Sequence, residues 1–246
     1  VASGLELTRR DDSPEAASQT VLNTVVYADG RLEGGEAWVE GCAIESVLHL
    51  AGGNVVTGLD LTRPLPLPRG ACLDIVPGRD GEGNPFHCLR VCHIHDNPKA
   101  TLIQGGAWCG MPLAGLPTRA GVPENGIWPE ELPARERSLW FARVHPIVAN
   151  PGEYADWRWL LESAGAGPSQ WAKWREAKRC SMADMARLLD HDAFIARRER
   201  LHCRAALPAF INALGSVDGP SARELATAVL ASDDDGQALA TRFCSL

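Results

Sequence analysis

Cysteine and histidine side chains gather in one short stretch of this sequence. Cys88, Cys92, His93 and His95 carry the thiol and imidazole groups that bind zinc in proteins. If the stretch is a strand, the two cysteines point to one face and the two histidines to the other. Each face then offers two ligands where a structural zinc ion needs about four. We therefore predict no metal site, but two packed thiols and two surface or interface histidines.

An acid, an amide and a cation follow directly on one predicted tight turn. Asp96, Asn97 and Lys99 surround Pro98, which holds the preceding Asn97 in an extended conformation. These polar groups could bind a sugar or a phosphate, or they could cap the last coil of a repetitive structure. The residues themselves leave both interpretations open.

Three further side chains are candidate ligand contacts. Asp74 lies in an apolar segment, where a carboxylate is costly unless it is paired or faces a cleft. A hydrogen bond to a neighbouring turn is the simpler interpretation, because most buried polar groups are satisfied structurally. Trp140 and Arg143 are expected at the seam between a β region and a helical region, where tryptophan usually packs.

Glycine-rich loops could present backbone amides to a phosphate. The segments Gly52-Gly53-Asn54 and 78–84 are of this kind, and Asn54 is kept as a candidate contact. No helix is predicted after either segment, and neither carries the lysine and hydroxyl residue of a nucleotide-binding P-loop, so both are predicted to be turns. The sequence also has no Gly-X-Ser-X-Gly pattern, which leaves a serine hydrolase without a nucleophile.

Composition narrows the class of protein. The 246 residues are 45% hydrophobic and carry a formal net charge of −7, which favours a folded protein and disfavours a broad nucleic-acid surface. No apolar run approaches the about 18 residues of a membrane span, and no basic-then-apolar leader opens the chain. The eight cysteines are interpreted as mostly buried thiols in a reducing cytoplasm. The chain opens on Val1, which favours an excised piece of a longer protein.

Short apolar runs of strand length, separated by turns such as Pro77-Gly78, fill residues 20–104. Such strands can build a sandwich, a barrel or a β-helix, and periodicity alone does not separate these folds. Residues 1–19 have little apolar periodicity and are expected to be a flexible lead-in. The predicted strands are Val21–Tyr27, Ala37–Val39, Ala43–Leu50, Asn54–Leu59, Ala71–Val76 and Cys88–Ile94.

The second half of the chain changes character. Residues 105–149 are dense in glycine and proline and are predicted to be a connector, whereas residues 150–246 show helical periodicity. Two capping pairs, Ser181 with Asp184 and Ser221 with Glu224, indicate helix starts. The arginines at 197, 198 and 200 are predicted to lie on the solvated face of a helix. The predicted fold class is α+β, with an all-β domain before a helical domain.

The amino-acid sequences of several segments resemble those of one family of enzymes. Over about residues 20–200, the chain resembles the region that follows the nucleotidyltransferase core in the L-fucokinase/GDP-fucose pyrophosphorylase family. That resemblance implies a parallel β-helix for residues 20–104. The segments that carry it are Gly52-Gly53-Asn54-Val55-Val56-Thr57-Gly58, Leu67-Pro68-Arg69-Gly70-Ala71-Cys72-Leu73-Asp74, Asp96-Asn97-Pro98-Lys99, Trp108-Cys109-Gly110-Met111-Pro112-Leu113 and Ser138-Leu139-Trp140-Phe141-Ala142-Arg143-Val144-His145-Pro146.

The resemblance also implies an activity for the parent enzyme. Such proteins phosphorylate L-fucose with ATP and join the fucose 1-phosphate to GMP from GTP, using Mg²⁺. Their nucleotidyltransferase and sugar-kinase signatures are missing from this sequence. We therefore expect the central structural region of a fucose-salvage enzyme, inactive alone, without a cofactor or an assigned catalytic residue of its own. Its expected partners are the two flanking domains, a sugar phosphate or nucleotide sugar, and further copies of itself, with no nucleic acid or membrane.

Two other functions stay open. The chain could be a stand-alone module that binds a carbohydrate or a sugar phosphate, or that acts as a scaffold. It could instead be an independent enzyme with a site at the seam of the β and helical regions, around Asp96, Lys99, Trp140 and Arg143.

Overall fold

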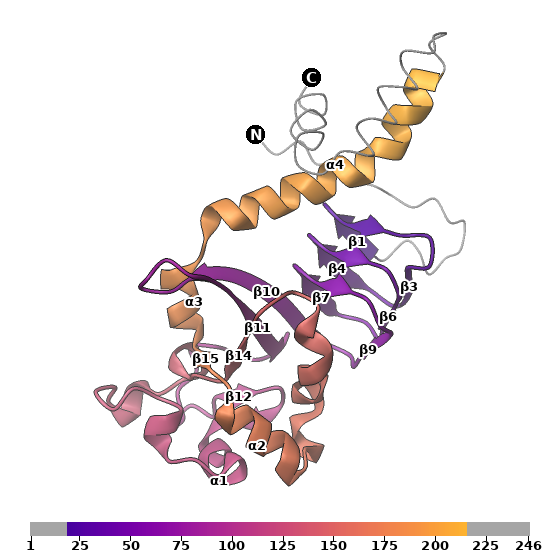
Figure 1. The fold of residues 1–246 in the computed structure, drawn as a ribbon. Coiled ribbons are helices and arrows are strands. Elements are labelled where there is room, and N and C mark those ends of the chain that lie inside the picture. Colours follow the sequence, from indigo (N-terminus) through magenta and orange to yellow (C-terminus); the bar gives the residue numbers. More distant parts are fainter. Residues whose placement is uncertain (1–18, 216–246) are drawn as a thin grey trace.

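A computed structural model of the protein describes residues 19–215. The expected lead-in, except for Gln19, and the capping pair Ser221 with Glu224 lie outside the described residues. The first half of the described chain is β structure, and helices dominate its end (Figure 1).

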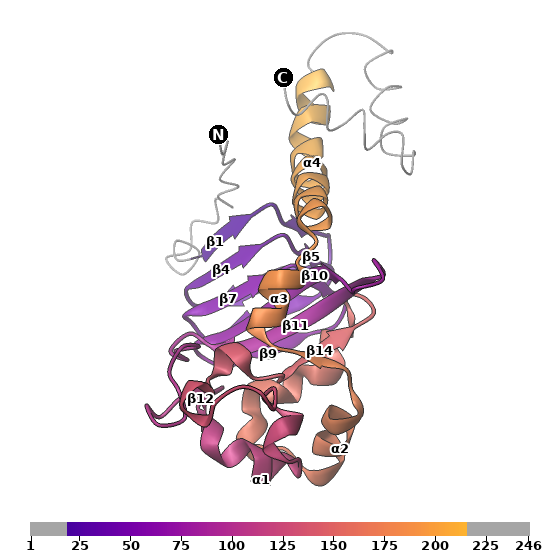
Figure 2. The ribbon, with the colours of Figure 1, turned by 90° about the vertical axis from the view of Figure 1, so that its left-hand side faces the viewer.

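A parallel β-solenoid forms the N-terminal region, as the sequence resemblance implied. Its strands recur three to a coil, and each pairs in parallel with the equivalent strand of the next coil (Figure 2). The three ladders comprise β1 (Gln19–Leu22), β4 (Ala37–Glu40) and β7 (Asn54–Thr57); β2 (Val25–Val26), β5 (Ala43–Ile44) and β8 (Asp60–Leu61); and β3 (Arg31–Gly34), β6 (Val47–Leu50) and β9 (Leu65–Leu67).

The solenoid core consists of aliphatic side chains stacked in register. Val39, Val56 and Leu73 occupy equivalent places on successive strands, and all three are buried. Leu48 and Leu65 stack in the same way in another ladder. Burial of each such side chain contributes about 1.5–3 kcal/mol. This repeated inward position holds the coils together and fixes which residues point outward.

The parallel pattern ends at a long antiparallel hairpin. Strand β10 (Ala71–Arg79) pairs in parallel with β7 on one side and antiparallel with β11 (Pro85–His93) on the other. Strands β14 (His145–Val148) and β15 (Arg179–Cys180) extend this main sheet, whose order is β1-β4-β7-β10-β11-β14-β15. The predicted turn at Pro77-Gly78 is wrong, because β10 continues through it and Asp190 N–H donates to the Pro77 carbonyl.

Residues 105–149 form short elements that nevertheless pack into the core. The indole N–H of Trp108 donates to Val91 carbonyl at 2.7 Å, and that of Trp128 donates to Ser138 carbonyl at 2.9 Å. Both rings are buried. The elements are β12 (Ala107–Trp108), β13 (Met111–Pro112), η2 (Leu113–Gly115), α1 (Leu116–Ala120), η3 (Glu124–Gly126), η4 (Ala134–Glu136) and η5 (Leu139–Phe141).

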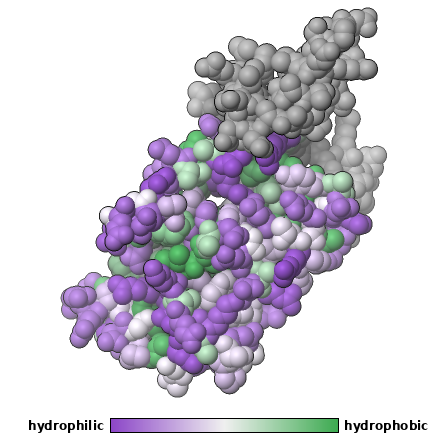
Figure 3. All heavy atoms as spheres, viewed as in Figure 1, coloured by the Kyte–Doolittle hydropathy of each residue, from purple (hydrophilic) through white to green (hydrophobic). Residues whose placement is uncertain are grey.

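Helices predominate after residue 150. Trp171 and Trp174 bury one face of α2 and meet edge to face, with ring centroids 5.6 Å apart. The predicted capping box of Ser181 with Asp184 is confirmed at the start of α3. The helices are η6 (Glu153–Gly165), α2 (Pro168–Glu176), α3 (Met182–Leu188) and α4 (His191–Gly215). Figure 3 shows mainly hydrophilic residues on the visible face of the described chain, with small hydrophobic patches between them.

Two arginines of α4 dock this helix on the solenoid. Arg197 donates to Asp60 at 2.6 Å and to Gly41 carbonyl, while Arg198 donates to Glu40 at 2.8 Å. The prediction that these two arginines face solvent is therefore wrong, because acidic side chains and backbone carbonyls of the coil corners accept their hydrogen bonds. Arg200 is exposed, as predicted.

Within residues 19–215, the helices are all too short or too polar to cross a lipid bilayer.

Gly58 tests the close contact between coils. Its φ is +70°, and a Cβ there would lie 2.5 Å from the Ile75 carbonyl oxygen. Gly58→Ala should lower the free energy of unfolding by about 1–3 kcal/mol in urea titrations, because both the backbone and the contact are strained. The control is Gly81→Ala, which adds the same methyl group where nothing lies within 4 Å. Equal stabilities of the two variants would contradict the prediction.

Candidate functional site

A cross-strand polar cluster lies on the outer face of the main sheet. Thr57, Asp74 and Arg90 are register partners on β7, β10 and β11. The Thr57 hydroxyl donates to the Asp74 carboxylate, and Arg90 Nη2 lies 2.6 Å from the other carboxylate oxygen. Asp74 is only 9% exposed, whereas the Arg90 side chain is 42% exposed. The expected partner of Asp74, a neighbouring turn, is wrong, because the partners are side chains of adjacent strands.

The cluster continues across the solenoid as a polar row of Glu40, Thr57, Asp74 and Arg90. Glu40 is the register partner of Thr57 and accepts hydrogen bonds from Trp38 Nε1 at 3.2 Å and from Arg198. Trp38 remains 41% exposed beside the row. Glu40, Arg90 and Trp38 were missed as candidates from the sequence. Alternation along each strand could have placed them outward, but strand register was needed to bring them together.

Two cysteines face each other in the next position of the same face. Cys72 on β10 lies directly opposite Cys92 on β11. A hydrogen bond from Cys92 and the nearby Arg90 charge lower the pKa of Cys72, whereas the same hydrogen bond and burial raise the pKa of Cys92. Burial raises the pKa of Cys109, which interacts electrostatically with both thiols. Among the described residues, no group of three or more acidic, histidine or cysteine side chains is placed to hold a metal ion.

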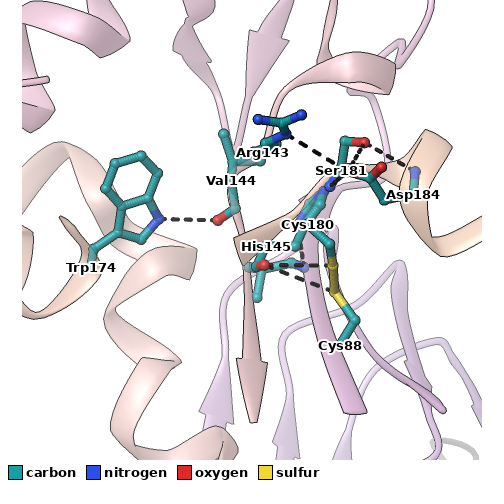
Figure 4. The surroundings of a disulfide bond; sticks show 9 residues. Cys88, Arg143, Val144, His145, Trp174, Cys180, Ser181 and Asp184 are labelled. Atoms are coloured by element: carbon teal, nitrogen blue, oxygen red, sulfur yellow. Dashed lines mark hydrogen bonds and ion pairs between the residues drawn. A yellow bond between two sulfur atoms is a disulfide. The ribbon is translucent and has the colours of Figure 1, made fainter. Parts of the chain in front are cut away.

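Cys88 is not the free, packed thiol that the sequence analysis predicted. It forms a disulfide with Cys180, which joins β11 to the short strand β15 (Figure 4). These two strands flank β14 in the main sheet, and the Sγ atoms of both cysteines lie next to the His145 carbonyl of β14. The prediction of a packed thiol is therefore wrong at Cys88. His93 is half-buried and His95 is exposed.

His145 lies fully buried beside this disulfide (Figure 4). Its Nδ1 accepts the Val91 N–H at 3.3 Å, which leaves the proton on Nε2. Burial lowers the pKa of His145 to about 3, and the charge of Arg90 acts in the same direction. The imidazole is therefore neutral in the folded protein.

The turn at residues 96–99 uses its polar groups within the chain. The Asp96 carboxylate accepts the backbone N–H groups of His93 at 2.7 Å and Cys109 at 2.8 Å. Asn97 accepts the N–H of Lys99 at 3.1 Å, and the Lys99 side chain is exposed. Asp96 thus caps the end of β11 and ties it to the following loop, one of the two roles considered for this turn.

The remaining candidates lie in different places. Asn54 is buried, donates to the carbonyls of Pro68 and Ala71, and accepts from Gly52 N–H. Its side chain therefore organises a solenoid corner.

Trp140 and Arg143 are the candidates that the sequence analysis expects at the seam of the β and helical regions. Trp140 is half-buried, and its backbone N–H donates to the Pro98 carbonyl at 2.8 Å, next to the 96–99 turn. Arg143 is exposed, with its Nε 4.0 Å from Asp184 (Figure 4). The structure thus links Trp140 to the 96–99 turn, while Asp74 belongs to the polar row.

The fold is that of a protein with a parallel β-solenoid, which ends at the antiparallel β10–β11 hairpin. A helical region packs on the main sheet that contains this hairpin. A family model described as the fucose pyrophosphorylase domain matches residues 2–150. The chain belongs to this family.

One curated relative is the bifunctional fucokinase/GDP-fucose pyrophosphorylase of Arabidopsis thaliana. It is 29% identical to this chain over 120 residues, which cover 48% of the chain and 11% of the relative. The chain therefore matches only a small part of the relative's length. No solved structure matches the chain. These comparisons confirm the family resemblance that the sequence motifs carried.

Arg90→Met tests the ion pair of the polar row. The change leaves the nearly buried Asp74 without its cation, and we expect the free energy of unfolding to fall by about 1–3 kcal/mol. The control is Arg187→Met, because Arg187 is 74% exposed in its pair with Asp184 and should change stability by less than about 0.5 kcal/mol. Urea unfolding measures both variants, and equal losses would contradict a specific role for Arg90.

The lowered pKa of the buried His145 leads us to predict that the stability of the protein depends on pH. The unfolded imidazole, with a pKa of about 6.5, takes up a proton that the folded protein excludes down to a pKa of about 3. Stability is therefore lost as the pH falls below 6.5, and His145 should account for about 2 kcal/mol between pH 7 and 5. Unfolding of wild type and His145→Gln across this range measures the difference. Parallel pH profiles of the two proteins would show that His145 is not responsible.

Proposed function

We propose that this chain is the β-solenoid and helical region of a cytoplasmic fucose-salvage enzyme that forms GDP-fucose from fucose 1-phosphate. The observation that carries the proposal is the family match over residues 2–150, supported by the similarity to the bifunctional Arabidopsis protein. Flanking nucleotidyltransferase and sugar-kinase domains would supply the Mg²⁺ and nucleotide chemistry. The solenoid would set their spacing, and copies of it could associate.

The contacts of the candidate residues support a positioning role. The side chains of Asn54 and Asp96 form hydrogen bonds with backbone groups of the solenoid corner and the 96–99 turn. Such side chains define the shape of the chain and have little capacity left for a ligand. The isolated chain is therefore expected to have no transferase activity.

Within residues 19–215, the polar row is the part best suited to form one wall of a sugar-phosphate site. Arg90 combines a fixed position, given by its 2.6 Å contact with Asp74, with a half-exposed guanidinium that suits a phosphate. Trp38, held by Glu40, offers a ring on which a sugar can stack. A guanidinium and an aromatic ring on one face of the sheet support this proposal.

A chimera tests the role of the region in the enzyme. The segment of the Arabidopsis relative that matches this chain would be replaced by the corresponding residues of this chain, and pyrophosphate release from GTP and fucose 1-phosphate would be measured. We expect activity from the chimera and none from this chain alone. A matched chimera carrying Gly58→Ala should lose activity along with stability. A folded but inactive chimera would argue against an equivalent role.

Calorimetric titration of the purified chain with fucose 1-phosphate tests the proposed wall. Saturable binding that is lost in Arg90→Met, but kept in Arg187→Met and Lys99→Ala, would support the polar row. Binding lost in Lys99→Ala would instead favour the 96–99 turn. Binding without any transferase activity in the chimera would favour the stand-alone binding module. If the folded wild-type chain binds none of the sugar phosphates tested, the result would favour a purely structural role for this chain.

A further inference from the structure

The opposed cysteines of the β10–β11 hairpin have a geometry that suits covalent pairing. The N–H and C=O of Val91, which lies opposite Leu73, bond to His145 and Trp108 and so point away from β10. Neighbouring pairs of an antiparallel ladder alternate in type, so Cys72 and Cys92 form a hydrogen-bonded pair with Cα atoms about 5.5 Å apart. That separation lies within the range of about 4.4–6.8 Å found for disulfides, whereas the Cβ atoms of such a pair, about 5.5 Å apart, must come about 1 Å closer. The two thiols can therefore be joined after a small local approach of the two strands.

The environment of the pair makes the two thiols unequal. Both are half-buried on the outer face of the main sheet, with the Asp74 and Arg90 pair in the next outward position. The hydrogen bond from Cys92 and the positive charge of Arg90 favour a thiolate at Cys72. Cys92 keeps its proton, because its pKa is raised. One thiol is thus suited to attack an oxidant and the other to resolve the product.

We propose that Cys72 and Cys92 form an oxidative modification site whose oxidant is hydrogen peroxide. The Cys72 sulfur attacks one peroxide oxygen, the O–O bond breaks, and one water leaves, which gives a sulfenic acid at Cys72. The Cys92 sulfur then attacks the Cys72 sulfur, the S–O bond breaks, and a second water leaves as the disulfide forms. The two thiols lose two electrons and two protons, and hydrogen peroxide takes up both.

The tryptic cleavage sites of the chain make the Cys72–Cys92 disulfide easy to identify, because trypsin separates four of the cysteines into different peptides. Cys72 lies in peptide 70–79, Cys88 in 80–90, Cys92 in 91–99 and Cys109 in 100–119. The full chain, as purified, would be exposed to a small excess of hydrogen peroxide, blocked with N-ethylmaleimide, digested without reduction and analysed by mass spectrometry. We expect a linked pair of peptides 70–79 and 91–99 to be the first new product.

Variants assign the two roles. Cys92→Ser should accumulate the sulfenic acid, trapped by dimedone on peptide 70–79, and Cys72→Ser should slow thiol loss from peptide 91–99 by about tenfold or more. Cys42→Ser is the matched control, because burial raises the pKa of Cys42 to about 12 and its loss should leave the oxidation rate unchanged. Circular dichroism checks that each variant is folded.

The wild-type peptide map decides the matter even if a variant does not fold. Peroxide that consumes other thiols before any link between 70–79 and 91–99 appears would overturn the proposal. A link from 91–99 to 100–119 as the main product would overturn it too, because Cys109 would then be the partner. Absence of a dimedone adduct on peptide 70–79 in folded Cys92→Ser would contradict the role of Cys72 as the attacking thiol.

Discussion

The parallel register of the solenoid coils is the constraint on which the rest of the structure depends. Because equivalent residues lie directly over one another, an apolar side chain at one inward position requires apolar side chains at the same position of the neighbouring coils, as in the stack of Val39, Val56 and Leu73. The same register determines the outward positions. The polar row is therefore the outer counterpart of the buried stack, and one residue of slippage would destroy both.

Strand β10 connects two kinds of structure. On one side it continues the parallel ladder, and on the other it begins the antiparallel sheet that carries β14 and β15. The helical region is fixed to this sheet and to the neighbouring solenoid coils at several points, through the Cys88–Cys180 disulfide, the hydrogen bond from Asp190 N–H to the Pro77 carbonyl and the arginines of α4. The candidate polar face is consequently positioned by both halves of the described chain.

Local patterns predicted the elements better than their contacts. Apolar runs of strand length located most strands of residues 20–104, and the Ser181 cap located α3, because both signals depend on neighbouring residues. The parallel β-helix itself came from family resemblance, since short alternating strands suit several folds. Arg197 was misjudged because its partner Asp60 is far away in sequence. The pairing of Asp74 with Arg90 likewise depends on strand register, which a single sequence does not fix.

The hairpin of β10 and β11 also limits how proteins of this architecture can change in length. A whole coil inserted among the parallel strands finds the same ladder above and below it, and the aliphatic stack simply becomes one layer taller. Beyond β10 the neighbouring strand runs in the opposite direction, and an inserted coil would meet no matching template. Gain and loss of repeats should therefore occur before β10, while the hairpin and the segments attached to it move together as a terminal cap.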